Sequence, residues 1–370
     1  MLSESRIKKI LIVAIYPAPY RVELINSISE YYQTDVFFEF SKGDFRDEKW
    51  FTRGKYFLLD TALGRDSFKR CKKNLSQYSL VIFYDYTTKE SVKLITKCKL
   101  TKTPYVLNAD GVMLATHGNM FRDFAKRFLI KGAKGYFASG EYAKKYFMKY
   151  GADEDRIFYH TFSTLHKNDL IKELPSKGRI LEIREKLGIP TNAKVAVAVG
   201  RFIPLKRFDV LIKMWKKMPS NYYLIIIGGG PEENRYRSLI SESHISNIAL
   251  EKFHEKEKLK EFYICADVLI HPTSYDVWGL VINEALACGL PVVVSDHCVA
   301  GLELIRQGIN GFVFQLYDDR EMCNYVIKIL ENDECRIKMK ENAVKSISEY
   351  TIENMAKSQL YALSRILNDA

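Results

Sequence analysis

The residues best suited to chemistry lie in one segment of the second half of the chain, Pro272–Ser295. Gly279 follows a loop and opens an apolar helix, so backbone N–H groups at the positive end of that helix are free to bind a phosphate. Asp276 precedes this helix and Glu284 lies within it, eight residues further on. Both carboxylates can face one cleft and accept hydrogen bonds from sugar hydroxyls. The alternative for Glu284 is an exposed helix residue, which its apolar neighbours disfavour.

Two bases stand in an earlier loop. An apolar run ends at Gly200, and Arg201 and Lys206 follow before the next helical pattern. An arginine binds two phosphate oxygens through its planar guanidinium, and a lysine adds a point charge. Together the two side chains can neutralise a diphosphate without a metal ion. Two loop bases are also typical of a solvated surface pair, so the pattern alone leaves both interpretations open.

A glycine run is the third candidate element. Gly228, Gly229 and Gly230 follow another apolar run and precede Pro231. Glycine lets a backbone approach a ligand closely, but this run lacks the GxGxxG spacing and identifies no cofactor. Further ligand contacts are expected near Phe253 and His254.

Short apolar runs alternate with helical patterns along both halves of the chain, which predicts parallel sheets with helices on both faces. In the first half we expect strands at Ile10–Ala14, Thr34–Glu39, Leu80–Tyr84, Tyr105–Leu107, Gly135–Ala138 and Arg156–Tyr159. In the second half we expect strands at Val195–Val199, Tyr223–Ile227, Ile248–Leu250, Val268–Ile270, Val292–Ser295 and Gly311–Phe314. The length of 370 residues favours two domains. The fold class is therefore α/β, with two doubly wound domains and a ligand cleft at the carboxyl ends of their strands.

Composition excludes several classes of protein. Hydrophobic residues make up 47% and charged residues 27% of the chain, which excludes extensive disorder. The apolar runs are too short for a membrane span or a signal peptide, so we expect a cytoplasmic protein. The seven cysteines form no CxxC pair and no metal-type cluster with histidine. They are expected to be reduced and mostly buried.

Taken in order, these segments resemble the retaining glycosyltransferases of family 4, which have the GT-B fold. The shared pattern is GRF-x-x-x-K, a glycine-rich strand end, ADV-x-x-x-P-(S/T), and E-x7-E followed by A-x-x-C/G-G-x-P-V-V. It covers residues 195–315. The resemblance implies an N-terminal acceptor-binding domain over residues 1–170, joined by a C-terminal helix at 350–370. It also implies a donor-binding domain over residues 188–349.

The resemblance also assigns roles to the donor-site residues. Arg201 and Lys206 would hold the donor diphosphate, and Glu284 would accept the ribose hydroxyls. Asp276 stands where the family usually has a glutamate that contacts the transferred sugar, so its shorter side chain leaves the sugar open. Backbone amides near the start of the helix, at Gly279, Leu280 and Val281, would bind the donor.

The first half is more divergent from the family. Asp110 occupies the place of a catalytic-cleft histidine, and His117 follows seven residues later. Either residue could touch the sugar or the acceptor, and His117 is equally well a plain loop residue. Further acceptor or cleft residues are expected in the opening loop and after a later strand, at Pro17, Tyr20, Arg21 and Glu141.

The resemblance implies a hexosyltransferase whose leaving diphosphate acts as the base, with no metal and no cofactor. No Asp-x-Asp motif appears where a metal-dependent transferase would need one. UDP-sugar is the first choice of donor and GDP-sugar the second. The acceptor is expected to be a glycan, lipid-diphosphate-linked, in capsule, O-antigen or exopolysaccharide assembly. A sugar-nucleotide epimerase on the same fold is the alternative enzyme.

The net charge of +11 predicts a polyanionic partner. Residues 117–150 alone hold eight basic and two acidic residues. Phe121, Phe124 and Phe128 share one face of a predicted helix in this stretch, with the bases Arg122, Lys126, Arg127 and Lys131 in or beside it. Such a helix is typical of a protein lying on an anionic membrane, although it also fits an ordinary core-facing helix. A nucleic-acid binder is disfavoured because no base-reading module is present.

Overall fold

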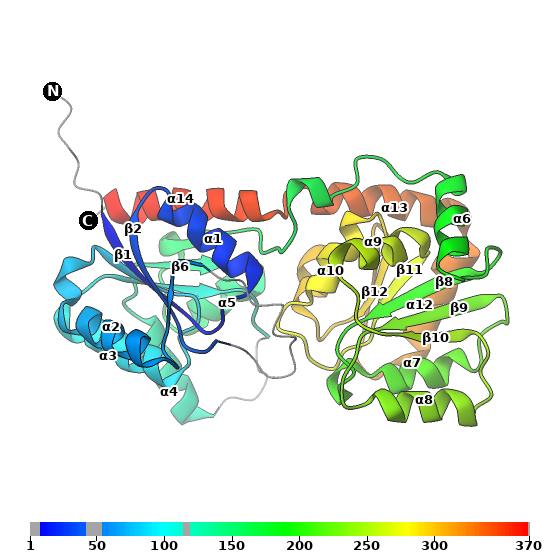
Figure 1. Cartoon of the computed structure of the whole chain (residues 1–370), viewed down its shortest axis with the longest axis horizontal. Coiled ribbons are helices and arrows are strands. Elements are labelled where there is room, and N and C mark those ends of the chain that lie inside the picture. The colour runs from blue at the N-terminus through cyan, green and yellow to red at the C-terminus, as the bar shows by residue number, and fades with distance from the viewer. Residues whose placement is uncertain (1–7, 42–53, 114–118, 369–370) are drawn as a thin grey trace. The chain divides into compact units, whose positions relative to one another are not determined.

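The structure is a computed structural model that describes residues 8–41, 54–113 and 119–368. The chain divides into two compact units (Figure 1). The N-terminal unit comprises Met1–Thr164 together with Thr351–Ala370, and the C-terminal unit comprises Leu165–Tyr350. Each unit is built on a parallel sheet, which confirms the predicted α/β fold class.

The described part of the N-terminal unit has seven parallel strands in the order β3-β2-β1-β4-β5-β6-β7. They are β1 (Lys9–Ala14), β2 (Gln33–Phe38), β3 (Phe57–Leu58), β4 (Leu80–Phe83), β5 (Tyr105–Ala109), β6 (Gly135–Ala138) and β7 (Ile157–Tyr159). Central strands such as β1 and β4 are continuous apolar runs because helices cover both of their faces. The strand order reverses between β1 and β4. Ligands of doubly wound sheets bind at the carboxyl ends of the strands at such a point.

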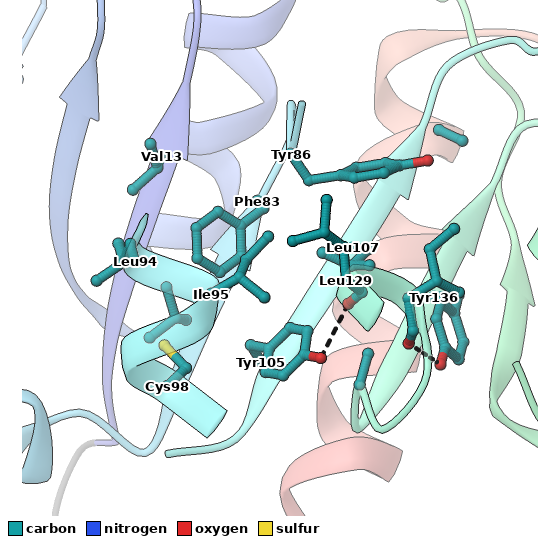
Figure 2. Close-up of a cluster of buried hydrophobic side chains, with 14 of the residues drawn as sticks. Val13, Phe83, Tyr86, Leu94, Ile95, Cys98, Tyr105, Leu107, Leu129 and Tyr136 are labelled. Atoms are coloured by element: carbon teal, nitrogen blue, oxygen red, sulfur yellow. Dashed lines mark hydrogen bonds between the residues drawn. The ribbon is translucent and has the colours of Figure 1, made fainter. Parts of the chain in front are cut away.

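Four helices cover one face of this sheet. They are α2 (Ala62–Lys73), α3 (Lys89–Thr101), α4 (Met120–Ile130) and α5 (Glu141–Lys149). Figure 2 shows the core beneath α3 and α4, where Leu94 and Ile95 meet Phe83. The hydroxyl of Tyr105 donates a hydrogen bond to the carbonyl of Leu129 at 3.0 Å and so anchors the end of α4.

Two further helices lie on the opposite face (Figure 1), α1 (Pro19–Ser29) and α14 (Ile352–Asn368). They pack against each other, and the hydroxyl of Tyr84 donates to Oε1 of Gln359 at 2.7 Å. The C-terminal helix is therefore part of the N-terminal unit.

The C-terminal unit, whose residues are all described, has six parallel strands in the order β10-β9-β8-β11-β12-β13. They are β8 (Lys194–Val199), β9 (Tyr222–Ile227), β10 (Ile248–Glu251), β11 (Val268–His271), β12 (Val292–Ser295) and β13 (Gly311–Phe314). Its helices are α6 (Lys177–Lys186), α7 (Phe208–Trp215), α8 (Glu233–Glu242), α9 (Lys256–Cys265), α10 (Leu280–Ala287), α11 (Val299–Leu304), α12 (Asp319–Glu331) and α13 (Asp333–Ile347). Here the strand order reverses between β8 and β11.

The twelve predicted strands are present, with ends that differ by two residues at most. The short strand β3 was not predicted, and no residue range was predicted for α2 or α5. Only Gly64, Ser67 and Phe68 are buried in α2, so its apolar signal is weak. The C-terminal helix α14 buries one apolar face that includes Met355 and Leu363. No helix in the described ranges is long and apolar enough to cross a membrane.

Candidate active site

The C-terminal unit brings Lys206 and Asp276 together where its strand order reverses. Lys206 lies in the loop after β8 and Asp276 in the loop after β11, and these two strands are neighbours in the sheet. Nζ of Lys206 lies 2.5 Å from Oδ2 of Asp276. The residue predicted to bind the diphosphate, Lys206, therefore forms an ion pair with the residue predicted to contact the sugar, Asp276.

Hydrogen bonds between the two loops hold this pair in place. The carbonyl of Leu205 accepts from Oγ1 of Thr273 at 3.0 Å and from the backbone N–H of Ser274 at 2.8 Å. Oγ of Ser295, at the end of β12, donates to the carbonyl of Thr273 at 2.5 Å. These hydrogen bonds fix the loop after β11 to the loop after β8 and to the end of β12, and so they position Asp276.

His271 is a third member of the cluster, and the sequence did not single it out. Its Nε2 lies 3.1 Å from Oδ2 of Asp276, and its side chain is 1% exposed. Burial alone would raise the pKa of Asp276, but the hydrogen bond to His271 and the charge of Lys206 lower it below its ordinary value. Burial and Lys206 lower the pKa of His271. The site therefore combines an ionised carboxylate with a neutral imidazole.

Cys298 completes a group that sequence spacing did not reveal. A ligand atom of His271, one of Asp276 and Sγ of Cys298 all lie within 4.8 Å of one another. The prediction that no cysteine joins a metal-type cluster with histidine is therefore wrong, because the fold brings distant residues together. Sγ of Cys298 donates to the carbonyl of Trp278 at 3.0 Å, and burial raises the pKa of this thiol. A metal ion bound by these three residues would have to deprotonate that thiol and displace Lys206 from Asp276.

Helix α10 begins beside this cluster. Gly279 precedes it with a φ of 99°, a conformation that favours glycine. A Cβ atom on Gly279 would lie 2.5 Å from Sγ of Cys298, so no larger residue fits without a shift. The amides of Leu280 and Val281, in the first turn, have no intrahelical partner. Donor binding by these amides stays a prediction.

Glu284 lies further along α10 and is held by a residue that the sequence reasoning missed. The hydroxyl of Tyr263, on α9, donates to Oε2 of Glu284 at 2.8 Å. Burial raises the pKa of Glu284 to about 7, while Tyr263 and Lys256 lower it. Tyr263 follows Phe262 in an amphipathic helix, where an aromatic residue indicates only a core position. No sequence motif points to its role.

Two glycines of the run after β9 are required by close packing, and the third has open space beside it. A Cβ atom on Gly228 would lie 1.9 Å from the carbonyl oxygen of Gly200, and one on Gly230 would lie 2.7 Å from that of Phe202. Nothing lies within 4 Å of a Cβ atom on Gly229. Gly228 and Gly230 therefore serve close contact between two protein loops, and Gly229 is the position with open space.

The remaining donor candidates differ in exposure. Arg201 is exposed and forms no ion pair within the described ranges. Phe253 is 66% exposed, whereas His254 stacks on Phe262 with ring centroids 5.3 Å apart. Arg201 and Phe253 are thus available to a ligand, while His254 is engaged within the protein.

In the N-terminal unit, Arg21 and Asp110 form a buried ion pair at the switch point of the sheet. Nη2 of Arg21 contacts Oδ2 of Asp110, and the side chain of Arg21 is 4% exposed. Its guanidinium stacks 3.9 Å from the ring centroid of Tyr84. Nδ2 of Asn108 donates to the other carboxylate oxygen of Asp110 at 2.8 Å. Two residues predicted separately are therefore one structural group.

Other buried polar side chains follow the neighbouring strand ends. Asp85 follows β4, Ser139 follows β6 and His160 follows β7. Burial raises the pKa of Asp85 to about 6 and lowers that of His160 to about 4. Both ring nitrogens of His160 and Oγ of Ser139 are buried without a hydrogen-bond partner in the described residues. This edge of the sheet is therefore polar and incompletely satisfied.

The other acceptor candidates lie nearby or cannot be placed. Pro17 is buried in the loop after β1, and the ring of Tyr20 packs edge-on against Phe162 with centroids 5.5 Å apart. Glu141 begins α5 and accepts a hydrogen bond from the hydroxyl of Tyr159. His117 lies outside the described residues.

Helix α4 presents its aromatic residues outward. Phe121 is 83% exposed, Phe124 75% and Phe128 44%, and only Leu129 and Ile130 are buried. The interpretation of α4 as an ordinary core-facing helix is therefore wrong for these three phenylalanines. Arg122, Arg127 and Lys131 are exposed beside them, and Lys126 is half-buried.

The comparisons with known proteins agree with this architecture. Residues 179–346 match the family model described as glycosyl transferases group 1. The D-inositol 3-phosphate glycosyltransferase of Corynebacterium efficiens is 30% identical over 214 residues, which are 55% of this chain and 49% of that protein. The N-acetyl-alpha-D-glucosaminyl L-malate synthase of Bacillus anthracis is 24% identical over 176 residues, 47% of this chain and 45% of that protein. The chain thus spans about half the length of the curated relatives it matches.

Solved structures resemble the whole chain. HepE of Anabaena, crystallised with UDP, has a TM-score of 0.76 and 19% identity, covering 96% of this chain and 100% of that one. Sucrose-phosphate synthase of Thermosynechococcus elongatus has a TM-score of 0.73 and 16% identity, covering 98% and 100%. At these identities the likeness establishes the fold. The chain therefore has the predicted GT-B fold, and its residues 179–346 are similar to the glycosyl transferases group 1 family.

Proposed function

We propose that the protein is a glycosyltransferase that moves a hexose from a nucleotide-sugar to a hydroxyl of a glycan acceptor. The observation that carries this proposal is the cluster of Lys206 and Asp276 beside the start of α10, at the switch point of the C-terminal sheet. A cation, a carboxylate and free helix amides at one place match the diphosphate and the sugar of such a donor. UDP is the first choice of nucleotide, and GDP is the second.

The donor is proposed to bind along the carboxyl edge of the C-terminal sheet. Arg201, which is exposed and unpaired in the described structure, and Lys206 take the diphosphate together with the amides of α10. Glu284 takes the ribose hydroxyls. Phe253 offers an exposed ring on which the base can stack. Asp276, already ionised, takes a hydroxyl of the transferred sugar.

The proposed reaction retains the anomeric configuration and needs no metal ion. The bond between the anomeric carbon and the diphosphate oxygen breaks, and the acceptor oxygen bonds to the same face of that carbon. The acceptor proton passes to the departing diphosphate. The contribution of the protein is electrostatic, since Lys206 and Arg201 stabilise the charge that grows on the diphosphate.

The acceptor is proposed to bind at the carboxyl edge of the N-terminal sheet, near Arg21 and Asp110. A lipid-diphosphate-linked glycan in capsule, O-antigen or exopolysaccharide assembly is the first candidate. The curated relatives are named for reactions of inositol 3-phosphate and L-malate, so a small anionic acceptor is the second candidate. Assays with both classes of acceptor separate the two.

A lipid-linked acceptor requires the enzyme to reach a membrane, and α4 supports this. Its exposed Phe121 and Phe124 are flanked by basic side chains. On the same face of the sheet, six basic residues of α2 and α3 line a hollow of about 420 Å³; they are Lys69, Arg70, Lys72, Lys73, Lys93 and Lys97. Apolar insertion combined with positive charge is what binds a protein to an anionic bilayer surface. These features support the proposal that the enzyme works on the inner face of the plasma membrane.

Nucleotide binding tests the donor proposal directly. Thermal unfolding is measured with UDP, GDP, ADP and CMP, each with and without EDTA. Stabilisation by one nucleoside diphosphate that EDTA leaves unchanged and Glu284→Ala abolishes supports the proposal. The donor sugar is then found by incubating nucleotide-sugars with and without acceptor. Conversion of the sugar nucleotide without an acceptor would favour the epimerase, and no nucleotide binding at all would overturn the assignment of the cleft.

A further inference from the structure

We propose that Tyr263 is a positioning residue that holds Glu284 in place for the ribose hydroxyls of the donor nucleotide. The inference deepens the donor site of the proposed function and rests on it. Tyr263 lies on α9 and Glu284 on α10, and these neighbouring helices pack against each other. Tyr263 therefore acts through Glu284.

The contact between the two side chains is direct. The hydroxyl of Tyr263 lies 2.8 Å from Oε2 of Glu284, and Tyr263 is 2% exposed. In the described residues, no other hydrogen bond is found for that hydroxyl or for the carboxylate of Glu284. One oxygen of the carboxylate is thus occupied by the protein, and Oε1 keeps its full capacity to accept hydrogen bonds from a ribose.

A carboxylate that must accept two ribose hydroxyls has to be oriented before the nucleotide arrives. Glu284 has several rotatable bonds, and fixing one oxygen removes much of this freedom in the unbound protein. Binding then loses less conformational entropy. The ring of Tyr263 fills space in the core, whereas its hydroxyl is the part that reaches Glu284. A phenylalanine at position 263 keeps the first role and removes the second.

The hydroxyl also favours the charged form of Glu284, which is the form that a ribose diol needs. Burial raises the pKa of this carboxyl to about 7, and the hydrogen bond from Tyr263 works against that rise. Lys256 and Asp169, which are paired with each other, act in opposite senses on Glu284. Cys288 lies close enough to sense its charge. Loss of the Tyr263 hydroxyl therefore raises the pKa of Glu284 further.

The test compares two ligands that differ only in the ribose. Dissociation constants of UDP and 2′,3′-dideoxy-UDP are measured by calorimetry for the natural protein, Tyr263→Phe, Glu284→Gln and the double variant. We expect Tyr263→Phe to weaken UDP binding about tenfold and to leave the dideoxy ligand unchanged, since one hydrogen bond to a charged group is lost. In Glu284→Gln the tyrosine substitution should have little further effect.

Tyr222→Phe is a matched control. Tyr222 is 1% exposed and donates to the carboxylate of Glu331, but it lies at the amino end of β9, away from the proposed site. This variant should bind both ligands like the natural protein. The midpoint of the pH dependence of UDP binding should rise in Tyr263→Phe and stay unchanged in Tyr222→Phe.

The outcomes separate this inference from the proposed function. If the natural protein prefers UDP to the dideoxy ligand and Tyr263→Phe keeps the full preference and the same pH midpoint, the role of Tyr263 is refuted while the donor site stands. Equal weakening of both ligands in Tyr263→Phe would indicate a purely structural residue and would also refute it. If UDP, GDP, ADP and CMP all fail to bind the natural protein, the proposed function and this inference fall together.

Discussion

Lys206 and Asp276 are 70 positions apart in the sequence, yet Nζ of Lys206 lies 2.5 Å from Oδ2 of Asp276. The pair is largely buried, with side-chain exposures of 12% and 20%. A donor diphosphate that draws Lys206 toward itself must weaken this ion pair. Asp276 then keeps its hydrogen bond to His271 and is free to accept one from the sugar. In the proposed donor site, this ion pair would therefore link diphosphate binding to sugar binding within one unit.

Removing the charge of Lys206 should slow the reaction. We expect Lys206→Ala to lower kcat at saturating donor by a factor of about 10² to 10³, because a donor that stabilises developing charge contributes about 3–4 kcal/mol. Initial rates with the matched nucleotide-sugar measure this. Lys213→Ala is the control, since Lys213 is exposed on α7 and its Nζ forms a surface ion pair with Asp209 at 3.7 Å. Near-normal turnover of Lys206→Ala would contradict the proposed role.

Substitutions at His271 should show whether its hydrogen bond orients the carboxylate of Asp276. His271→Phe removes the hydrogen bond to Asp276, and we expect kcat to fall about 10- to 100-fold, the effect of losing a hydrogen bond to a charged group. His271→Gln can still donate through its side-chain amide and should recover a large part of the rate. UDP affinity should change little in both variants. If kcat fell equally in His271→Phe and His271→Gln while thermal stability stayed unchanged, an orienting hydrogen bond would be contradicted.

The buried His160 should make the protein sensitive to acid. Burial lowers its pKa from 6.5 to about 4, so the folded protein binds fewer protons at this site than the unfolded chain between those values. Its contribution to stability is complete above about pH 6.5 and is lost as the pH falls toward 4. We expect His160→Asn to remove roughly 2–3 kcal/mol of the stability loss between pH 7 and pH 4.5. Thermal unfolding at both pH values measures it.

His244→Asn is the control for that experiment. His244 is exposed, and its φ of 52° suits asparagine. This variant should show the same acid destabilisation as the natural protein. If His160→Asn lost as much stability between pH 7 and pH 4.5 as the natural protein, another group would be responsible for the acid sensitivity.

The outward face of α4 should bind anionic vesicles. We expect the double variant Phe121→Ser/Phe124→Ser to reduce partition onto phosphatidylglycerol-containing vesicles at least tenfold, since burial of one phenylalanine contributes about 1.5–3 kcal/mol. Co-sedimentation measures the bound fraction. Tyr361→Ser is the control, because Tyr361 is 62% exposed on α14, on the opposite face of the sheet. Binding that is equal in all three proteins would refute the role of α4.

The positive charge in the hollow between α2 and α3 should contribute to vesicle binding independently of the phenylalanines of α4. We expect Lys73→Glu/Lys97→Glu to weaken vesicle binding at low salt and to flatten its salt dependence, because surface electrostatics are screened by ions. Vesicles without anionic lipid provide the comparison. An unchanged salt dependence would show that this hollow does not meet the bilayer.

The order of local patterns along the chain determined the fold class and the position of the loops that form the proposed donor site. The strands of both sheets were predictable because buried parallel strands are continuous apolar runs. Arg201, Lys206, Asp276 and Gly279 were predicted as site residues because each lies at a strand end or helix start within a recognisable motif. Glu284, further along α10, was predicted from its place in the same motif. These signals are local, so they appear in the sequence alone.

Only the tertiary structure decided which partners these residues have. Asp276 meets Lys206, His271 and Cys298, and Asp110 meets Arg21 across 89 positions of sequence. Tyr263 and His271 carry no motif of their own, since an aromatic residue in a helix and a histidine in a strand are ordinary core residues. The outward exposure of Phe121 and Phe124 was equally hidden, because an apolar helix face reads the same whether it covers a core or meets solvent. Such contacts depend on strand order and loop pairing, which no local pattern encodes.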